Sequence, residues 1–153
     1  MSWEVEFTDD FEAWWNALTE SEQVSVDASV RLLERCGPML PYPHSSAIRA
    51  SRHGAMRELR VQHAGRPLRV LYVFDPRRVA VLLLGGDKMG NRRWYGETVP
   101  RADAMYDRHL RDLLRGGDSN GQEIQDSSLE HEKNRPSPGS TKGARDDART
   151  ATP

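Results

Sequence analysis

The chain has 153 residues, of which 37% are hydrophobic and 29% charged, and its formal net charge is −1; this size and balance fit one modest domain with a single core. Its one cysteine, Cys36, excludes an internal disulfide and a cysteine-based zinc cluster, and favours a reducing compartment. No signal segment opens the sequence and no apolar run approaches the roughly 20 residues that span a bilayer, so we expect a cytoplasmic protein without a membrane partner.

The near-zero net charge hides two segments of opposite sign. Residues 1–34 hold nine Asp and Glu against one Arg, whereas residues 35–101 hold thirteen Arg and Lys against four Asp and Glu. This polarity indicates a basic surface for a polyanion or for an acidic partner. The alternative is that the acidic segment neutralises the basic one within the same fold. Lys88 is the only lysine of the basic segment, and arginine suits bidentate phosphate contacts and base stacking.

The first part of the chain predicts one strand and two helices. Residues 3–7 alternate apolar and acidic side chains, as a half-buried strand does. A short helix follows, with Asp9 and Glu12 resembling a capping pair. A second helix opens with the capping box of Thr19 and Glu22 and runs to about residue 35, before a glycine cap and a proline. We expect Trp14 and Trp15, on the first helix, to contact the sheet rather than a ligand.

The second part predicts three strands and a last helix. After an ordered loop rich in Pro, Ser and Gly, residues 56–63 and 66–74 form a hairpin, residues 79–86 a buried central strand, and residues 98–114 an amphipathic helix with Pro100 in its first turn. The order β-α-α-β-β-β-α predicts an α+β domain over residues 1–115: a small antiparallel sheet with helices packed on one face and the other face partly open. Residues 116–153 predict a disordered tail.

Two arginines face each other in the middle of the hairpin. If Ala64 and Gly65 form a two-residue turn, then Arg60 lies directly opposite Arg69, on the face away from the apolar residues. Like charges opposite each other destabilise an antiparallel pair, and this conflict favours a functional role. The alternative is that Glu58 or Glu97 neutralises the two arginines and the face is simply solvated.

The next strand brings further cations to the same end of the sheet. If residues 75–78 form the turn, Phe74 pairs with Val79, and Arg69 faces Leu84. The loop that follows then brings Lys88 toward Arg60 and Arg69. A rim is expected from Arg57, Arg92, Arg93 and Tyr95. Arginines beside aromatic rings are typical of a groove for single-stranded nucleic acid, where cations hold phosphates and rings stack on bases.

The order of these motifs resembles a known family. Glu58-Leu59-Arg60, then Arg69-Val70-Leu71-Tyr72, Asp75 and Lys88 are similar to the core pattern of the RelE/HigB-type toxins of bacterial toxin–antitoxin systems, in particular their phage-derived branch. The resemblance covers residues 3–115. In GGDKMGN the chain lacks the aromatic residue and the second lysine that many members carry.

The resemblance implies an endoribonuclease that cuts messenger RNA, in the ribosomal A site, without a metal or cofactor. The ribose 2′-hydroxyl attacks the adjacent phosphorus, which calls for charge stabilisation and proton transfer. The implied catalytic residues are Arg60, Arg69 and Lys88, with Lys88 as charge stabiliser or base. Candidates for the acid are Tyr95 and His63. The implied RNA-binding residues are Arg57, Arg66, Arg92, Arg93 and Tyr95. The five histidines lack metal-ligand spacing.

The resemblance also implies partners and leaves two rival functions open. The expected partner is a cognate antitoxin, a helix-turn-helix protein encoded next to the toxin, through which alone the complex would reach operator DNA. The first rival is a gyrase inhibitor, because a sister branch of the fold has that target. The second is a catalytically inactive component of a DNA-binding repressor complex.

Overall fold

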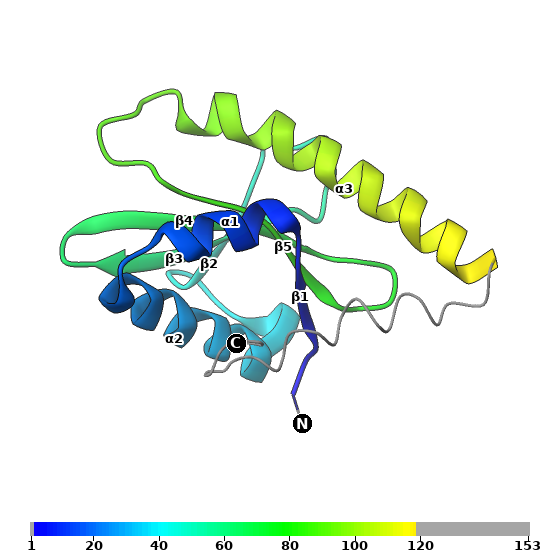
Figure 1. Cartoon of the computed structure of the whole chain (residues 1–153), viewed down its shortest axis with the longest axis horizontal. Helices are drawn as coiled ribbons and strands as arrows, with labels where there is room; N and C mark the ends of the chain where they lie inside the picture. Colours follow the sequence, from blue (N-terminus) through cyan, green and yellow to red (C-terminus); the bar gives the residue numbers. More distant parts are fainter. Residues whose placement is uncertain (1, 119–153) are drawn as a thin grey trace. The chain divides into compact units, whose positions relative to one another are not determined.

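The structure, a computed structural model, describes residues 2–118. A first compact unit ends at Asp107, and the described residues from Arg108 on belong to a second unit. The sheet, its core and the site belong to the first. In chain order the elements are β1 (Val5–Phe7), α1 (Asp9–Ala17), α2 (Glu20–Cys36), the 3₁₀ turn η1 (Gly37–Met39), β2 (Ser45–Ala47), β3 (Arg57–His63), β4 (Arg66–Phe74), β5 (Ala80–Asp87) and α3 (Trp94–Asp118) (Figure 1).

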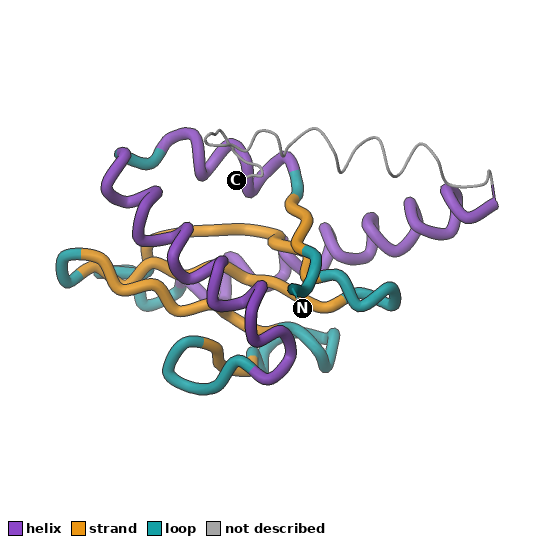
Figure 2. The backbone as a smooth tube through the Cα atoms, turned by 90° about the horizontal axis from the view of Figure 1, so that it is seen from below, coloured by secondary structure: helices purple, strands orange, loops and turns teal. Residues whose placement is uncertain are grey.

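The five strands form one mostly antiparallel sheet in the order β1-β5-β4-β3-β2 (orange in Figure 2). Only β1 pairs in parallel, with β5 at one edge of the sheet. This arrangement confirms the predicted α+β class. The edge strand β2 lies in the segment predicted to be a loop, because three residues of Ser and Ala carry no strand pattern; pairing with β3 makes them a strand.

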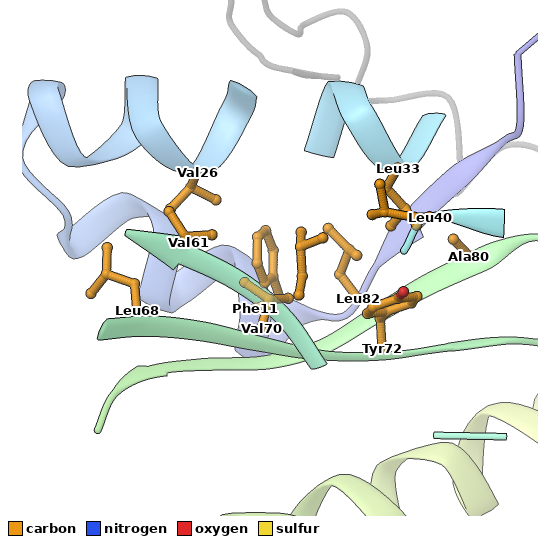
Figure 3. Close-up of a cluster of buried hydrophobic side chains, with 11 residues drawn as sticks. Phe11, Val26, Leu33, Leu40, Val61, Leu68, Val70, Tyr72, Ala80 and Leu82 are labelled. Carbon is orange, nitrogen blue, oxygen red and sulfur yellow. The ribbon is translucent and has the colours of Figure 1, made fainter. Parts of the chain in front are cut away.

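One face of the sheet packs against α1 and α2. Buried side chains from both helices and from β3, β4 and β5 meet in a continuous apolar core (Figure 3). Phe11 comes from α1, and Val26 and Leu33 come from α2. The sheet contributes Leu59, Val61, Leu68, Val70, Tyr72, Ala80 and Leu82. These include the alternate hairpin residues predicted to face the helices, so the pattern of period two is confirmed.

The second face is less open than predicted. Its strand residues Leu71, Val73 and Leu83 are buried, and the part of α3 before Arg108 lies on this side of the sheet (Figures 1 and 3). That part of α3 contributes buried Trp94, Val99, Ala102, Met105 and Tyr106. This face therefore buries Glu58 and Arg69 but leaves Arg60 partly exposed, so the two opposed arginines have different environments.

Capping explains where the first two helices begin. The predicted capping box of α2 is confirmed: the Glu22 amide donates to Thr19 Oγ1 at 3.2 Å, and the Thr19 amide donates to Glu22 Oε1 at 2.8 Å. The predicted Asp9–Glu12 pair is wrong. The cap of α1 is Thr8, whose Oγ1 accepts from the Phe11 amide at 3.0 Å and donates to the Leu83 carbonyl at 2.8 Å. Thr8 therefore caps the helix and ties its start to β5.

Two adjacent glycines at the end of β5 each contact a tryptophan ring, one on each face of the sheet. A Cβ added at Gly85 would overlap the ring of Trp14, from α1, whereas a Cβ at Gly86 would overlap Trp94, from α3. Both rings therefore lie against bare backbone, an approach that any larger residue would block. Trp14 makes the helix–sheet contact predicted for it.

The hairpin register is confirmed, whereas the next register is not. Ala64 and Gly65 have φ of +48° and +80°, as a two-residue type I′ turn requires, and Arg60 pairs with Arg69. Between β4 and β5, Phe74 pairs with Ala80 rather than Val79. A register shift between Leu71 and Tyr72 then places Arg69 opposite Gly86 rather than Leu84.

The turn between β4 and β5 is organised by a buried carboxylate. Asp75 accepts hydrogen bonds from the Arg77 amide at 2.9 Å and from the Val79 amide at 3.2 Å. Its other oxygen accepts from the Arg77 guanidinium, which also binds Glu6 on β1. These contacts lengthen the turn by one residue beyond the predicted four, which accounts for the first step of the register error.

The last helix begins earlier and ends later than predicted. It starts at Trp94, so Pro100 lies inside the helix rather than in its first turn; the Asn91 side chain accepts from the Arg93 amide at 3.0 Å and turns the chain into the helix. It continues to Asp118, three residues past the predicted boundary of the tail. The remaining predicted tail, residues 119–153, lies outside the described residues. None of the helices within residues 2–118 is long and apolar enough to cross a membrane.

Candidate active site

The opposed arginines share one buried carboxylate. Glu58 points to the same face as Arg60 and Arg69, and its side chain is only 5% exposed. Its Oε2 lies 3.1 Å from Arg60 Nη1, and its Oε1 lies 3.6 Å from Arg69 Nε. Glu58 therefore neutralises the pair, as the alternative interpretation of the sequence allowed. Glu97 instead accepts a 3.4 Å hydrogen bond from Asn91.

Tyr95 joins this cluster from the start of α3. Its hydroxyl donates to Glu58 Oε1 at 2.6 Å. Burial raises the pKa of Tyr95, the hydrogen bond and charge of Glu58 raise it further, and Arg69 opposes the rise. Lys88 Nζ lies 5.7 Å from the centroid of the Tyr95 ring, within reach of a cation–π contact. The structure thus brings together four predicted site residues: Arg60, Arg69, Lys88 and Tyr95.

The two arginines differ in what they can reach. The Arg60 side chain is 28% exposed, and its guanidinium lies 5.3 Å from the centroid of the exposed Tyr42 ring. The Arg69 side chain is 6% exposed, and its Nη1 donates to the Leu68 carbonyl at 3.0 Å. Among the described residues, Arg69 Nε has no hydrogen-bond partner. Arg60 can therefore contact a phosphate directly. Arg69 is buried, and its charge affects Glu58 and Tyr95 instead.

Two predicted RNA-binding arginines lie elsewhere. Arg57 has the strand parity of Leu59, so it points to the opposite face from Arg60, and its Nε donates to Ser45 Oγ at 2.8 Å. Arg66, at the hairpin turn, is bound by Glu22 and, at 2.7 Å, by Asp87. Both guanidinium groups serve local structure in this conformation. The expected rim is therefore smaller than predicted.

Of the remaining predicted site residues, two lie near the cluster and one lies away from it. Arg92 and Arg93 are exposed in the loop between β5 and α3, immediately before Trp94, where they can flank the site. His63 lies apart, because its Nδ1 is 2.8 Å from Ser25 Oγ on α2. Of the two candidates for the acid, only Tyr95 lies in the cluster.

The charge asymmetry is partly resolved within the fold. Glu22 of the acidic segment binds Arg66 of the basic segment, and Glu6 binds Arg77. These pairs support the alternative that part of the acidic segment neutralises the basic one. Arg60 and Lys88 take no part in these pairs. Within residues 2–118, Glu58 is the carboxylate that pairs with Arg60 and Arg69.

Sequence reasoning missed one polar member of the cluster and did not give another a place in the site. Glu58 was considered only as a neutraliser, although the period of two places it on the face of Arg60. Ser46, which donates to Glu58 Oε2 at 3.3 Å, gave no signal because β2 was not predicted. Within residues 2–118, no three His, Cys, Asp or Glu side chains gather as ligands for one metal ion.

The arrangement suits chemistry on an anion. Arg60 and Lys88 offer positive charge beside the Tyr95 phenol, which carries its proton near neutral pH. Glu58 is buried and accepts hydrogen bonds from both Arg60 and Tyr95, which restricts the rotation of these two side chains. A site of this kind can stabilise developing negative charge and supply a proton.

Comparison with known proteins gives the family. The model of the family described as "Phage derived protein Gp49-like" matches residues 13–107. The Mycobacterium tuberculosis protein named "Putative toxin HigB3" is 42% identical over 107 residues, which are 69% of this chain and 92% of the relative. "Putative toxin HigB2" of the same organism is 41% identical over 100 residues, 64% of this chain. The chain spans 50% of that second relative.

The chain is also similar in structure to solved proteins whose sequences are more distant. A mutant of the Escherichia coli toxin RelE in the free state has a TM-score of 0.49 at 13% identity, over 66% of this chain and 98% of that one. The archaeal RelE–RelB complex from Pyrococcus horikoshii has a TM-score of 0.43 at 15% identity, over 59% and 99%. The family assignment rests on the sequence matches: this chain belongs to the RelE/HigB-type toxins, in their phage-derived Gp49-like family.

Proposed function

We propose that this chain is the toxin of a toxin–antitoxin system and acts as a metal-independent endoribonuclease that cuts messenger RNA on the ribosome. The observation that carries the proposal is the meeting of Arg60, Lys88 and Tyr95 on one side of a buried carboxylate. The relatives named as toxins support the toxin role. Loss of intact messenger RNA would inhibit translation.

The site residues have distinct roles in this reaction. The ribose 2′-oxygen attacks the adjacent phosphorus and loses its proton, the bond to the 5′-oxygen breaks, and that oxygen gains a proton. The products are a 2′,3′-cyclic phosphate and a 5′-hydroxyl. Arg60 stabilises charge on the pentacoordinate phosphate. Lys88 adds to that stabilisation or accepts the 2′-hydroxyl proton.

Tyr95 is the candidate for the acid that protonates the leaving oxygen. The nearby Arg69 charge lowers the pKa of Tyr95 and so favours release of this proton, whereas burial and Glu58 raise that pKa and oppose its release. In the free protein this proton points to Glu58, so substrate must redirect it. Arg69 and Glu58 are positioning residues, because both side chains are buried.

The proposed partners follow from the family. A cognate antitoxin, a helix-turn-helix protein encoded next to the toxin, would bind this chain and carry the complex to operator DNA. The substrate would be messenger RNA held in the ribosomal A site. The basic residues at the site match the charge of that substrate.

Cleavage of messenger RNA on translating ribosomes tests the proposal. Purified full-length chain should produce RNA ends with a 2′,3′-cyclic phosphate, and Lys88→Gln should lower the rate at least about tenfold, the equivalent of about 1.4 kcal/mol of transition-state stabilisation. Arg101→Gln, on an exposed residue of α3, is the control and should keep the wild-type rate. A wild-type rate for Lys88→Gln would remove this residue from the mechanism, and an absence of cleavage by the wild type would reject the nuclease.

The burial of Arg69 favours one alternative class. A guanidinium that is 6% exposed and paired with Glu58 also fits a member of the fold without nuclease activity, either a gyrase inhibitor or a component of a DNA-binding repressor complex. Induction of the chain in cells separates these functions. A nuclease stops translation without DNA damage, a gyrase inhibitor causes DNA damage, and a repressor component causes neither.

A further inference from the structure

We propose that the groove between α2 and β3 is a binding subsite for a base of single-stranded RNA, and that the adjacent Tyr42 is the stacking platform. This inference rests on the proposed function, since it assigns the nucleotide next to the cleaved phosphate to a place on the protein. Neither Tyr42 nor the residues of the groove were among the predicted site residues, apart from Arg60 and Arg69.

The groove has the size and wall chemistry of a ligand site. It has a volume of about 440 Å³, within the range of small-molecule sites. One wall is α2, with Ala28 and Leu32 among its residues, and the other is β3, with Val61. Hydroxyl, amide and imidazole groups line the same space: Ser25, Ser29, His44 and Gln62. Apolar walls with a few hydrogen-bonding groups suit a flat heterocycle, which needs both stacking area and edge contacts.

An exposed aromatic ring lies against Arg60, one of the residues that line the groove. Tyr42 is 71% exposed, and its ring lies over the Arg60 guanidinium, with 5.3 Å between the guanidinium carbon and the ring centroid. Tyr42 directly precedes Pro43, a residue of the groove wall. A large exposed ring held beside an arginine is the combination that single-strand binders use for stacking bases and holding phosphates.

Arg60 links the groove to the cluster around Glu58. Its side chain lines the groove and its Nη1 lies 3.1 Å from Glu58 Oε2. Its amide also donates to the His44 carbonyl at 2.9 Å, which anchors the loop that carries Tyr42. A phosphate at Arg60 therefore has the candidate acid on one side and the groove on the other. One nucleotide step beyond that phosphate, a base can stack on Tyr42 and enter the groove.

Gln62 is the residue expected to read the base. Its side chain is exposed on β3 beside the groove, and an amide offers both a donor and an acceptor to a base edge. Stacking on Tyr42 is expected to be tolerant of sequence, because every base has a π-face. Tyr42 should therefore govern affinity, and Gln62 should govern preference among bases.

Binding and cleavage, measured on the full chain, test the subsite. The probe for binding is a set of short single-stranded RNAs with 2′-O-methyl riboses, which block cleavage, followed by fluorescence anisotropy. Tyr42→Leu should weaken binding about tenfold, whereas Tyr42→Phe should keep it. Gln62→Ala should alter the base preference. Met39→Ala, on a residue that is 80% exposed and does not line the groove, is the control and should change neither.

The outcomes separate this inference from the proposed nuclease. Binding that depends on Tyr42 without any cleavage by the wild type would support the subsite and reject the nuclease. If the wild type cleaves RNA, and Tyr42→Leu has the same affinity for RNA and the same preference for bases beside the cleaved phosphate, the subsite is rejected and the nuclease is kept. If Tyr42→Leu and Gln62→Ala no longer bind the cognate antitoxin but still bind RNA as the wild type does, the groove is a protein-docking site and the inference is wrong. The inference is also wrong if the wild type binds no RNA.

Discussion

The Tyr95 hydroxyl donates a 2.6 Å hydrogen bond to the Glu58 carboxylate, joining the first turn of α3 to the middle of the hairpin. The same carboxylate binds Arg60 and lies beside Arg69. Glu58 therefore links side chains from β3, β4 and α3 in one cluster. It controls both the charge of the cluster and the direction of the Tyr95 proton.

The first prediction concerns the titration of Tyr95. Glu58→Gln removes the negative charge that raises the pKa of Tyr95, while Arg69, which lowers that pKa, remains. The pKa of Tyr95 should therefore fall. Ultraviolet absorbance of tyrosinate measures it, with Tyr95→Phe in each background to identify its share of the signal. If the titration of Tyr95 is the same in both proteins, the hydrogen bond to Glu58 does not exist in solution.

The second prediction compares the two opposed arginines. From the hairpin alone, loss of one of two like charges should cost no stability, but the burial of Arg69 changes that expectation. Arg69→Ala leaves Glu58 without a buried counter-charge and should lower the free energy of unfolding by about 3 kcal/mol. Arg60→Ala, at a more exposed position, should lower it by at most about 1 kcal/mol. Denaturant unfolding measures both, and equal effects would contradict the burial of Arg69.

The third prediction uses two glycines that differ in the space around them. A Cβ at Gly86 would overlap the Trp94 ring, whereas a Cβ at Gly96 meets nothing within 4 Å. Gly86→Ala should therefore lower the free energy of unfolding by about 1–3 kcal/mol, and Gly96→Ala, inside α3, should raise it by up to about 1 kcal/mol. Thermal unfolding of the two variants is the measurement. A neutral Gly86→Ala would show that Trp94 does not lie against β5.

The fourth prediction concerns stability in acid. The Thr19 amide and Arg66 lower the pKa of Glu22 below 4.5. Burial would raise the pKa of Asp87, but the Met89 amide and Arg66 lower it below 3.8. Carboxylates with a depressed pKa in the folded state stabilise it above their ordinary pKa, and this contribution is lost as the pH falls through the folded pKa.

Arg66→Gln should therefore reduce the loss of stability between about pH 5 and about pH 3. The unfolding free energy at several pH values in this range gives the slope. Arg31→Gln removes the same charge from an exposed helical pair with Asp27 and should leave the slope nearly unchanged. A slope in Arg66→Gln equal to that of the wild type would mean that Arg66 does not bind these carboxylates in solution.

Local features of the sequence determined where α2 begins and how β3 pairs with β4. The capping box of Thr19 and Glu22 begins α2, and the Ala64–Gly65 turn sets the pairing of Arg60 with Arg69. Both follow from residues within a few positions of each other. The alternation of apolar residues likewise identified which side of the hairpin meets α1 and α2. The same alternation was not applied to Arg57, which was expected at the rim of the site but points to the opposite face from Arg60.

The tertiary structure decided what surrounds the arginines. The shift between Leu71 and Tyr72 changes the β4–β5 register, because an extra residue in a bulge leaves no signal in an apolar run. The position of α3 brings Tyr95 to Glu58 across 37 positions of sequence, and β2 brings Ser46 to the same carboxylate. Burial depends on such distant segments, so only the fold makes Arg60 an accessible cation and Arg69 a buried one, although the sequence presents them as equals.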